Sequence, residues 1–206
     1  INHSLTATFD NKNVGSSKAV TVNSVSLSDG TNGGLAANYS LSTGQTTTAN
    51  ITPKTLTATA SASNKVYDGI TIATTALTFS GLVGSETLGQ TVGSTFSDKN
   101  VGSGKTVTVN SITLADGSNG GLALNYSISS GQTTTANITA KALTVSGITA
   151  SDKTYDGNAV ATLNTGSILY SGLINGDTFS GTYTGAFNNA NAGTGKTVTI
   201  TPSYTG

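Results

Sequence analysis

The sequence of 206 residues contains no cysteine, methionine, tryptophan or arginine, and it has one histidine and one glutamate. Without cysteine the chain has no disulfide framework, no thiolate nucleophile and no cysteine-ligated metal. A Ser-His-Asp triad would have to use His3, near the start, and a carboxylate pair would have to come from scattered aspartates. Zinc ligands are lacking as well. We therefore expect neither enzymatic activity nor a cofactor.

Charge and long apolar runs are also scarce. Charged residues make up 9% of the chain, and the formal net charge is zero. The chain therefore has no basic field for nucleic acid or for an anionic lipid surface. No apolar run reaches the roughly 18 residues that a spanning helix needs. We expect no nucleic-acid partner and no insertion into a membrane.

What the chain does contain is threonine, serine and asparagine alternating with valine, isoleucine and leucine, a pattern typical of β-strands over a thin core. The phase of the alternation slips by one residue between Val107/Val109 and Ile112/Leu114, which predicts a β-bulge near Asn110. The earlier run Val20–Leu27 contains the same slip. The predicted strands of the central part are Leu56–Ala60, Lys65–Tyr67, Ala76–Phe79, Thr106–Leu114, Leu124–Ser129 and Thr133–Ile138.

One stretch of sequence occurs twice, 87 residues apart. Phe9–Pro53 and Phe96–Ala140 are identical at 33 of 45 positions. A period of this length is too long for one turn of a solenoid and fits one small antiparallel β-sandwich. We expect residues 1–53 to be the C-terminal part of a first repeat, 54–140 a complete second repeat, and 141–206 the N-terminal part of a third.

Two copies of a Tyr-Asp-Gly motif, within Lys65–Gly69 and Lys153–Gly157, predict tight turns. We expect the glycines to have positive φ and the aspartate side chains to accept hydrogen bonds from nearby backbone N–H groups. The tyrosines are expected to pack inward. The residues of the structural motif are Tyr67, Asp68, Gly69, Tyr155, Asp156 and Gly157. A weaker hypothesis makes Asp68 and Asp156 ligands of Ca²⁺.

A second glycine-rich segment, Asp29–Gly34 with its copy Asp116–Gly121, is expected to be a hairpin loop. It lacks the spacing and the final acidic residue of a calcium loop, so Asp29 and Asp116 are only weak candidates for Ca²⁺. A Lys–Asn or Lys–Asp isopeptide bond is a further alternative for Lys54, Lys65 or Lys105, with Glu86 as the assisting acid.

Taken together, the Lys-x-Tyr-Asp-Gly motif, the Asn-Val-Gly turn before a Thr/Val strand, and the closing segment Asn125–Lys141 identify a resemblance. The sequence resembles the YDG and MBG-type repeats of large bacterial surface proteins, including filamentous-haemagglutinin-like adhesins of two-partner secretion. That resemblance implies extracellular Greek-key or immunoglobulin-like modules at the bacterial cell surface. In the third repeat Ala192 replaces the valine of Asn-Val-Gly.

The expected function is that of a stalk segment, which holds an adhesin's binding tip away from the cell and supports adhesion or biofilm cohesion. Its expected partners are neighbouring repeats of the same chain and, beyond them, a host or matrix glycan or protein. Two alternatives stay open. One is a carbohydrate- or receptor-binding module that uses the loops at a sandwich end, and the other is a fibre segment that self-associates by donating strands.

Overall fold

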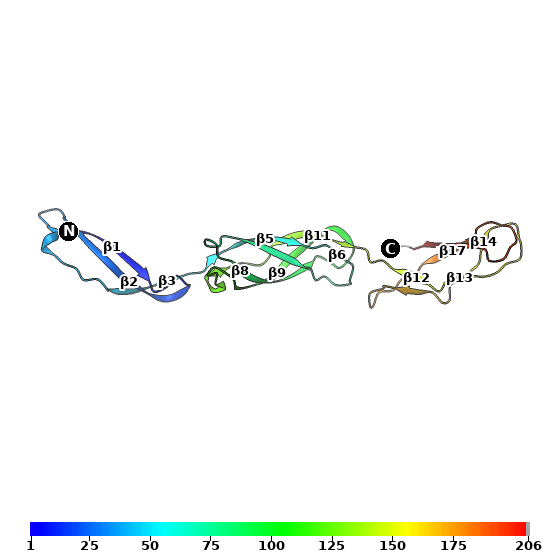
Figure 1. The fold of residues 1–206 in the computed structure, drawn as a ribbon, viewed down its shortest axis with the longest axis horizontal. Coiled ribbons are helices and arrows are strands. Elements are labelled where there is room, and N and C mark those ends of the chain that lie inside the picture. The colour runs from blue at the N-terminus through cyan, green and yellow to red at the C-terminus, as the bar shows by residue number, and fades with distance from the viewer. Residues whose placement is uncertain (205–206) are drawn as a thin grey trace. The chain divides into compact units, whose positions relative to one another are not determined.

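The computed structural model describes residues 1–204. Within this range the chain consists of β-strands and two single-turn 3₁₀ helices, η1 (Ala36–Asn38) and η2 (Ala123–Asn125), with no α-helix (Figure 1). The expected all-β class is confirmed. Among the same residues no helix is long and apolar enough to pass through a membrane.

Spatial contacts group the chain into two compact units, neither of which is continuous in sequence. The first contains residues 1–63, 71–97 and 104–136, and the second contains residues 64–70, 98–103 and 137–206.

The first unit begins with an antiparallel sheet of three strands in the order β1 (Asn2–Phe9), β2 (Gly15–Ser28) and β3 (Thr46–Ile51). Every residue of β1 is exposed, because the sheet has no second layer over it in the described chain. Leu5 is 55% exposed and Phe9 39%.

The rest of the first unit contains a pair of antiparallel strands and a larger sheet. The pair is β5 (Thr57–Ala62) with β7 (Thr75–Ser80). In the larger sheet β8 (Leu88–Phe96) lies antiparallel to β9 (Gly102–Asp116), and β11 (Thr133–Thr139) is on the other side of β9. Two short strands, β4 (Lys54–Thr55) and β10 (Tyr126–Ser127), pair in parallel.

The predicted β-bulge lies at Asn110. Gly93 of β8 is opposite Ser111 and Ser94 is opposite Val109, so Asn110 is the extra residue. Its side-chain Nδ2 donates a hydrogen bond of 3.0 Å to Thr95 Oγ1 across the strands. The first copy has the same bulge: Thr6 is opposite Ser24, Ala7 is opposite Val22, and Asn23 donates to Thr8 at 3.0 Å. Both predicted phase slips are thus confirmed.

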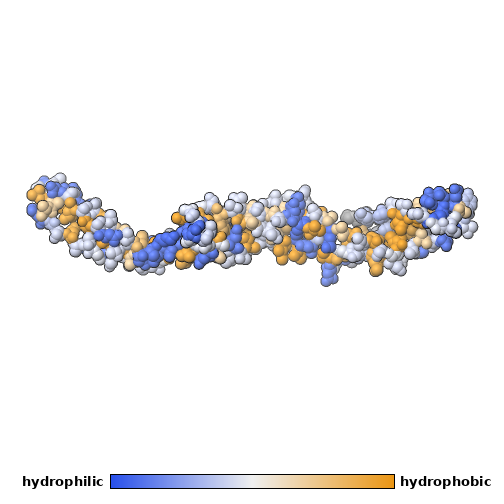
Figure 2. Space-filling view, in the orientation of Figure 1, coloured by the Kyte–Doolittle hydropathy of each residue, from blue (hydrophilic) through white to orange (hydrophobic). Residues whose placement is uncertain are grey.

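The core is small and belongs almost entirely to residues 54–140. Val107 and Val109 of β9 are fully buried, and Phe96 of β8 and Leu77 of β7 are 3% and 6% exposed. Buried residues therefore come from both the strand pair and the larger sheet. Apolar side chains also remain at the surface, as the orange patches of Figure 2 show for the face in view.

Two predictions from the sequence need correction, and one strand was missed. Strand β8 was not predicted, because Gly89 and Gly93 interrupt its apolar pattern. The predicted strand Leu124–Ser129 is instead the 3₁₀ helix η2 followed by the two-residue strand β10. Finally, neither Asp29–Gly34 nor Asp116–Gly121 is a complete hairpin loop, because each begins a longer connection, through η1 to β3 in the first copy and through η2 and β10 to β11 in the second.

The second unit contains β6 (Lys65–Val66), which pairs in parallel with the end of β11. Most of its other strands are short: β12 (Thr144–Ser146), β13 (Thr149–Ala150), β14 (Val160–Ala161), β15 (Leu163–Asn164), β16 (Leu169–Ser171), β17 (Thr182–Phe187) and β18 (Val198–Ser203). Strand β12 pairs with β16, and β13 with β15. Strands β14, β17 and β18 form an antiparallel sheet in that order. The β17–β18 ladder has no register shift, so the bulge of the other two copies does not recur there.

Candidate functional site

The first Tyr-Asp-Gly turn is held together by a lysine. Lys65 Nζ lies 2.7 Å from Asp68 Oδ1 and donates a second bond of 2.7 Å to the carbonyl oxygen of Ile70. The backbone N–H of Ile70 donates to the same Asp68 oxygen at 3.1 Å. Gly69 has φ of +80°, in the left-handed region where glycine is favoured. The expected positive φ and the N–H donor on the aspartate are both confirmed.

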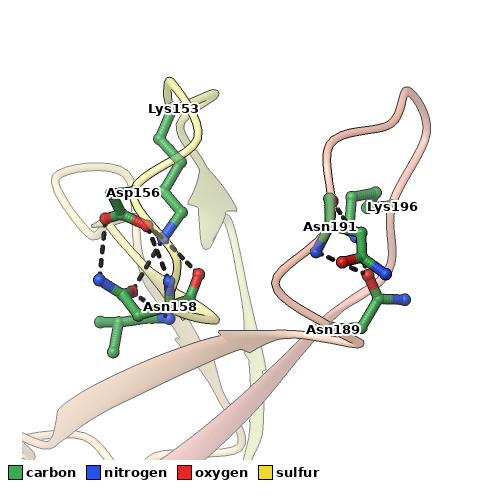
Figure 3. A network of polar contacts seen from close by, with 7 residues as sticks. Lys153, Asp156, Asn158, Asn189, Asn191 and Lys196 are labelled. Atoms are coloured by element: carbon green, nitrogen blue, oxygen red, sulfur yellow. Dashed lines mark hydrogen bonds and ion pairs between the residues drawn. The ribbon is translucent and has the colours of Figure 1, made fainter.

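The second copy of the turn repeats this arrangement (Figure 3). Lys153 Nζ is 2.8 Å from Asp156 Oδ1 and 2.8 Å from the carbonyl oxygen of Asn158. The Asn158 N–H donates to Asp156 Oδ1 at 3.1 Å, and Gly157 has φ of +76°. Asn158 also closes the turn with its own side chain, because its Nδ2 donates to Asp156 Oδ2 at 2.9 Å.

These contacts occupy the two carboxylates that were weak candidates for Ca²⁺. The lysine hydrogen bond is the first cause that lowers the pKa of Asp68 and of Asp156 below the ordinary aspartate value. Each carboxylate is thus paired with an ammonium group that competes with a cation. Residues 1–204 contain no cluster of three histidine, aspartate or glutamate side chains placed to hold a metal ion.

Asp29 and Asp116 lie at the start of the two 3₁₀ helices and bind backbone there. Asp29 Oδ1 accepts a hydrogen bond of 2.7 Å from the N–H of Ala36, and Asp116 Oδ1 accepts one of 2.7 Å from Ala123. The glycine-rich segment between each pair lets the chain turn back, with φ of +57° at Asn119. These aspartates fix the path from the long strand into the 3₁₀ helix.

A second lysine-centred turn lies next to β2 in the first copy and next to β18 in the third. Lys18 Nζ contacts Asp10 Oδ1 at 2.8 Å and Asn11 Oδ1 at 2.7 Å. In the third copy Lys196 Nζ donates to Asn189 Oδ1 and, at 2.7 Å, to the carbonyl oxygen of Asn191. Figure 3 shows this turn facing the Lys153 turn. Both turns line one open pocket of about 600 Å³.

The comparison with known families agrees with these repeated turns. A model of the YDG domain matches residues 1–49, 52–136 and 139–206, which is nearly the whole chain. The chain belongs to the YDG domain family. No curated protein and no solved structure matched the sequence.

The tyrosines of the two YDG turns have different surroundings. Tyr67 is half-buried, and its hydroxyl donates a hydrogen bond of 2.9 Å to Asp177 Oδ2 within the second unit. That bond is the first cause that raises the pKa of Tyr67 above its ordinary value. Tyr155 is 67% exposed. The prediction that both tyrosines pack inward is therefore wrong for Tyr155.

The loop that carries Asp177 has a counterpart in the preceding YDG repeat. Gly172–Asp177 aligns with Gly81–Glu86, so Asp177 and Glu86 occupy the same position. Glu86 also binds the repeat before it: Lys12 Nζ lies 2.7 Å from Glu86 Oε1 within the first unit. The Glu86 side chain is only 9% exposed. The hydrogen bonds from Lys12 and then from Tyr126 lower the pKa of Glu86 below its ordinary value.

The same contact region of the first unit includes four hydrogen bonds made by Tyr126 and Asn125. Tyr126 Oη donates to Glu86 Oε2 and accepts the N–H of Val83 at 3.1 Å. Asn125 Oδ1 accepts the N–H of Val14 at 2.8 Å, and its Nδ2 donates to Asn13 Oδ1 at 3.1 Å. Residues near the Asn-Val-Gly turn of one YDG repeat are thus bound by the next repeat.

Sequence reasoning missed this contact surface. The sequence suggested Glu86 as the assisting acid of an isopeptide bond and Asn125 as part of the closing segment, and it paired neither residue with the preceding repeat. One signal was present in the segments Gly81–Glu86 and Gly172–Asp177, each of which we call a Gly-Leu loop. Both begin with Gly-Leu and end with an acidic residue, although they differ at the three positions between.

Proposed function

We propose that the chain is a run of spacer repeats from the stalk of a large bacterial cell-surface adhesin. Each YDG repeat adds length between the cell and a binding tip. The proposal places the protein outside the cell, with neighbouring YDG repeats as its main partners and without a cofactor or an enzymatic activity. Repeat boundaries at 53/54 and 140/141 fit this proposal.

The observation that carries the proposal is the recurring contact between successive repeats. In each unit the acidic residue of the Gly-Leu loop accepts a hydrogen bond from the repeat before it, Glu86 from Lys12 and Asp177 from Tyr67. A chain that uses the same loop position for the same purpose at successive junctions is organised for serial stacking.

The local chemistry also supports a structural role. The lysines of the YDG turns hold aspartate and backbone oxygens of their own turns. Such internal pairing fixes the turn and leaves few polar groups for a substrate. The buried residues of the strand pair and of the larger sheet support the finer proposal of an antiparallel β-sandwich of about 87 residues, of the Greek-key or immunoglobulin-like kind.

The proposal can be tested by changing the number of repeats. Zero, one or two extra copies of residues 54–140 would be inserted after Ala140, where they keep the period, and the chain would be anchored to a supported bilayer by one terminus. The height above the bilayer of a fluorophore at the other terminus should increase by the same amount with each inserted copy. No rise with copy number would contradict a spacer.

The same series separates a spacer from a binding module. A carbohydrate array probed with the chain should show no glycan whose affinity depends on one particular repeat. A glycan bound at micromolar or tighter affinity, and lost with a single repeat, would favour the binding-module alternative.

A further inference from the structure

The pocket at the end of the third YDG repeat has an open, partly aromatic lining. It lies between the turn of Lys153 and Asn158 and the turn of Asn189, Asn191 and Lys196 (Figure 3), and Tyr155 belongs to its lining. Tyr155 leaves 67% of its surface exposed beside it. The lysines on both sides are already bonded to side-chain or backbone oxygens of their own turns, so the shape of the pocket is fixed by internal contacts.

The same end of the second repeat is occupied. Tyr67, Asn100 and Val101 are the counterparts of Tyr155, Asn191 and Ala192, and they line a pocket together with Leu173, Ile174 and Asp177 of the third repeat. Within this second unit the Tyr67 hydroxyl is bonded to Asp177.

The glycine of the YDG turn also takes part in that contact. A Cβ atom built on Gly69 would lie 2.7 Å from Cγ2 of Ile174, so the loop of the next repeat sits directly over the glycine. Around Gly157, the counterpart of Gly69, nothing lies within 4 Å of the same position. The open pocket and the occupied one thus differ by the presence of a Gly-Leu loop.

We propose that the pocket between the Lys153 and Lys196 turns is a docking site for the Gly-Leu loop of a further YDG repeat. Tyr155 donates its hydroxyl proton to the acidic residue at the end of that loop, and the loop's branched apolar residue covers Gly157. This inference rests on the proposed spacer function, and it names the partner of the exposed end.

Two substitutions distinguish the pocket of the third repeat from that of the second. Asn158 stands where the second repeat has Ile70, and Ala192 stands where it has Val101. The smaller alanine leaves room for a larger side chain from the partner, whereas the Asn158 amide is used within its own turn, where it binds Lys153 and Asp156. A neutral oligosaccharide stacked on Tyr155 is the competing occupant.

The test compares the reactivity of the two tyrosines. Because Gly206 aligns with Ala115, a second copy of residues 116–206 attached after Gly206 continues the repeat in phase and supplies a further Gly-Leu loop. Tetranitromethane modifies accessible phenolates, and peptide mass spectrometry reports the original Tyr155 separately when the appended copy carries Tyr155→Phe, because the two copies otherwise give the same peptide. In the original chain Tyr155 should be nitrated and Tyr67 protected. In the extended chain the nitration of Tyr155 should slow by about tenfold, because the docked loop covers the side chain and only the undocked fraction reacts.

A matched control carries Asp177→Asn and Ile174→Asp in the appended copy only, and it should restore the nitration of Tyr155. The same two substitutions in the original chain should expose Tyr67, which tests the equivalence of the two pockets without any added segment. If Tyr67 stays protected there, the Gly-Leu loop is not what covers this end, and the docking proposal is wrong.

The remaining outcomes separate the two proposals. Tyr67 protected but Tyr155 equally reactive in both chains would overturn docking and leave the spacer proposal standing. Rapid nitration of both tyrosines in the original chain would contradict the contact between repeats and with it the spacer proposal. Protection of Tyr155 by millimolar chitotetraose or maltoheptaose, with none from the appended repeat, would assign the pocket to a glycan.

Discussion

Replacing Val109 by alanine should destabilise the second repeat far more than the same change at Val22 destabilises the first. Both valines precede the bulge asparagine of the long strand in nearly identical sequence. Val109 is fully buried, whereas Val22 is only half-buried in a sheet that has no second layer in the described chain.

The size of the effect follows from the lost methyl groups. Removing two buried methyl groups costs about 1.6 kcal/mol of transfer free energy. The cavity left in a packed site raises the cost at Val109 to about 2–3 kcal/mol. At Val22 water already reaches part of the side chain and no closed cavity forms, so the cost should stay below about 1 kcal/mol.

Hydrogen exchange read by mass spectrometry measures the two sites in one chain. Local stability sets the exchange rate of a strand, so the Val109 variant should exchange about 30- to 150-fold faster over β9. The Val22 variant should change exchange over β2 by less than about fivefold. Equal effects at the two sites would refute the inference that only the second repeat has a closed core.

Three further predictions concern the turns, the contact between repeats and the bulge. Gly69→Ala and Gly157→Ala should each lower the free energy of unfolding by about 1–2 kcal/mol, because alanine is strained at a positive φ. Gly69→Ala should lose more than this in thermal unfolding, because the added Cβ also meets an isoleucine side chain. Equal losses for the two variants would contradict the occupied pocket. Glu86, the only glutamate, gives one carboxyl signal after selective ¹³C labelling. Because the pKa of Glu86 is lowered in the folded state, the stabilisation from Glu86 is complete above the ordinary glutamate pKa of 4.5 and is lost as the pH falls through the folded-state pKa. Lys12→Ala should raise the pKa of Glu86, and an unchanged titration would refute the ion pair. Asn110→Ala removes a cross-strand hydrogen bond and should cost about 0.5–1 kcal/mol in urea unfolding, whereas no loss would show that the side chain does not stabilise the bulge.

Local features were predictable from the sequence because their partners lie close along the chain. The YDG turn depends on residues within five positions of its lysine, and glycine at a positive φ leaves a recognisable pattern. The bulge at Asn110 was predictable because a slip in a two-residue period can be read directly.

Contacts between distant residues were not predictable in this way. Lys12 and Glu86 are 74 positions apart, and Asn13 and Asn125 are 112 apart. Nothing in the local sequence around either pair specifies the other member. Burial is equally hidden: Phe9 and Phe96 begin the same repeated stretch, yet one is 39% exposed and the other 3%. The difference depends on whether a second layer packs against the strand.

The measurement that most directly tests the spacer proposal is small-angle X-ray scattering on chains with zero, one, two and three inserted copies of residues 54–140. If successive repeats dock through the Gly-Leu loop, the maximum dimension should increase by the same amount with every copy. If the repeats are joined as freely moving beads, the dimension should instead grow only as about the 0.5–0.6 power of chain length. The second result would contradict a spacer built from stacked YDG repeats.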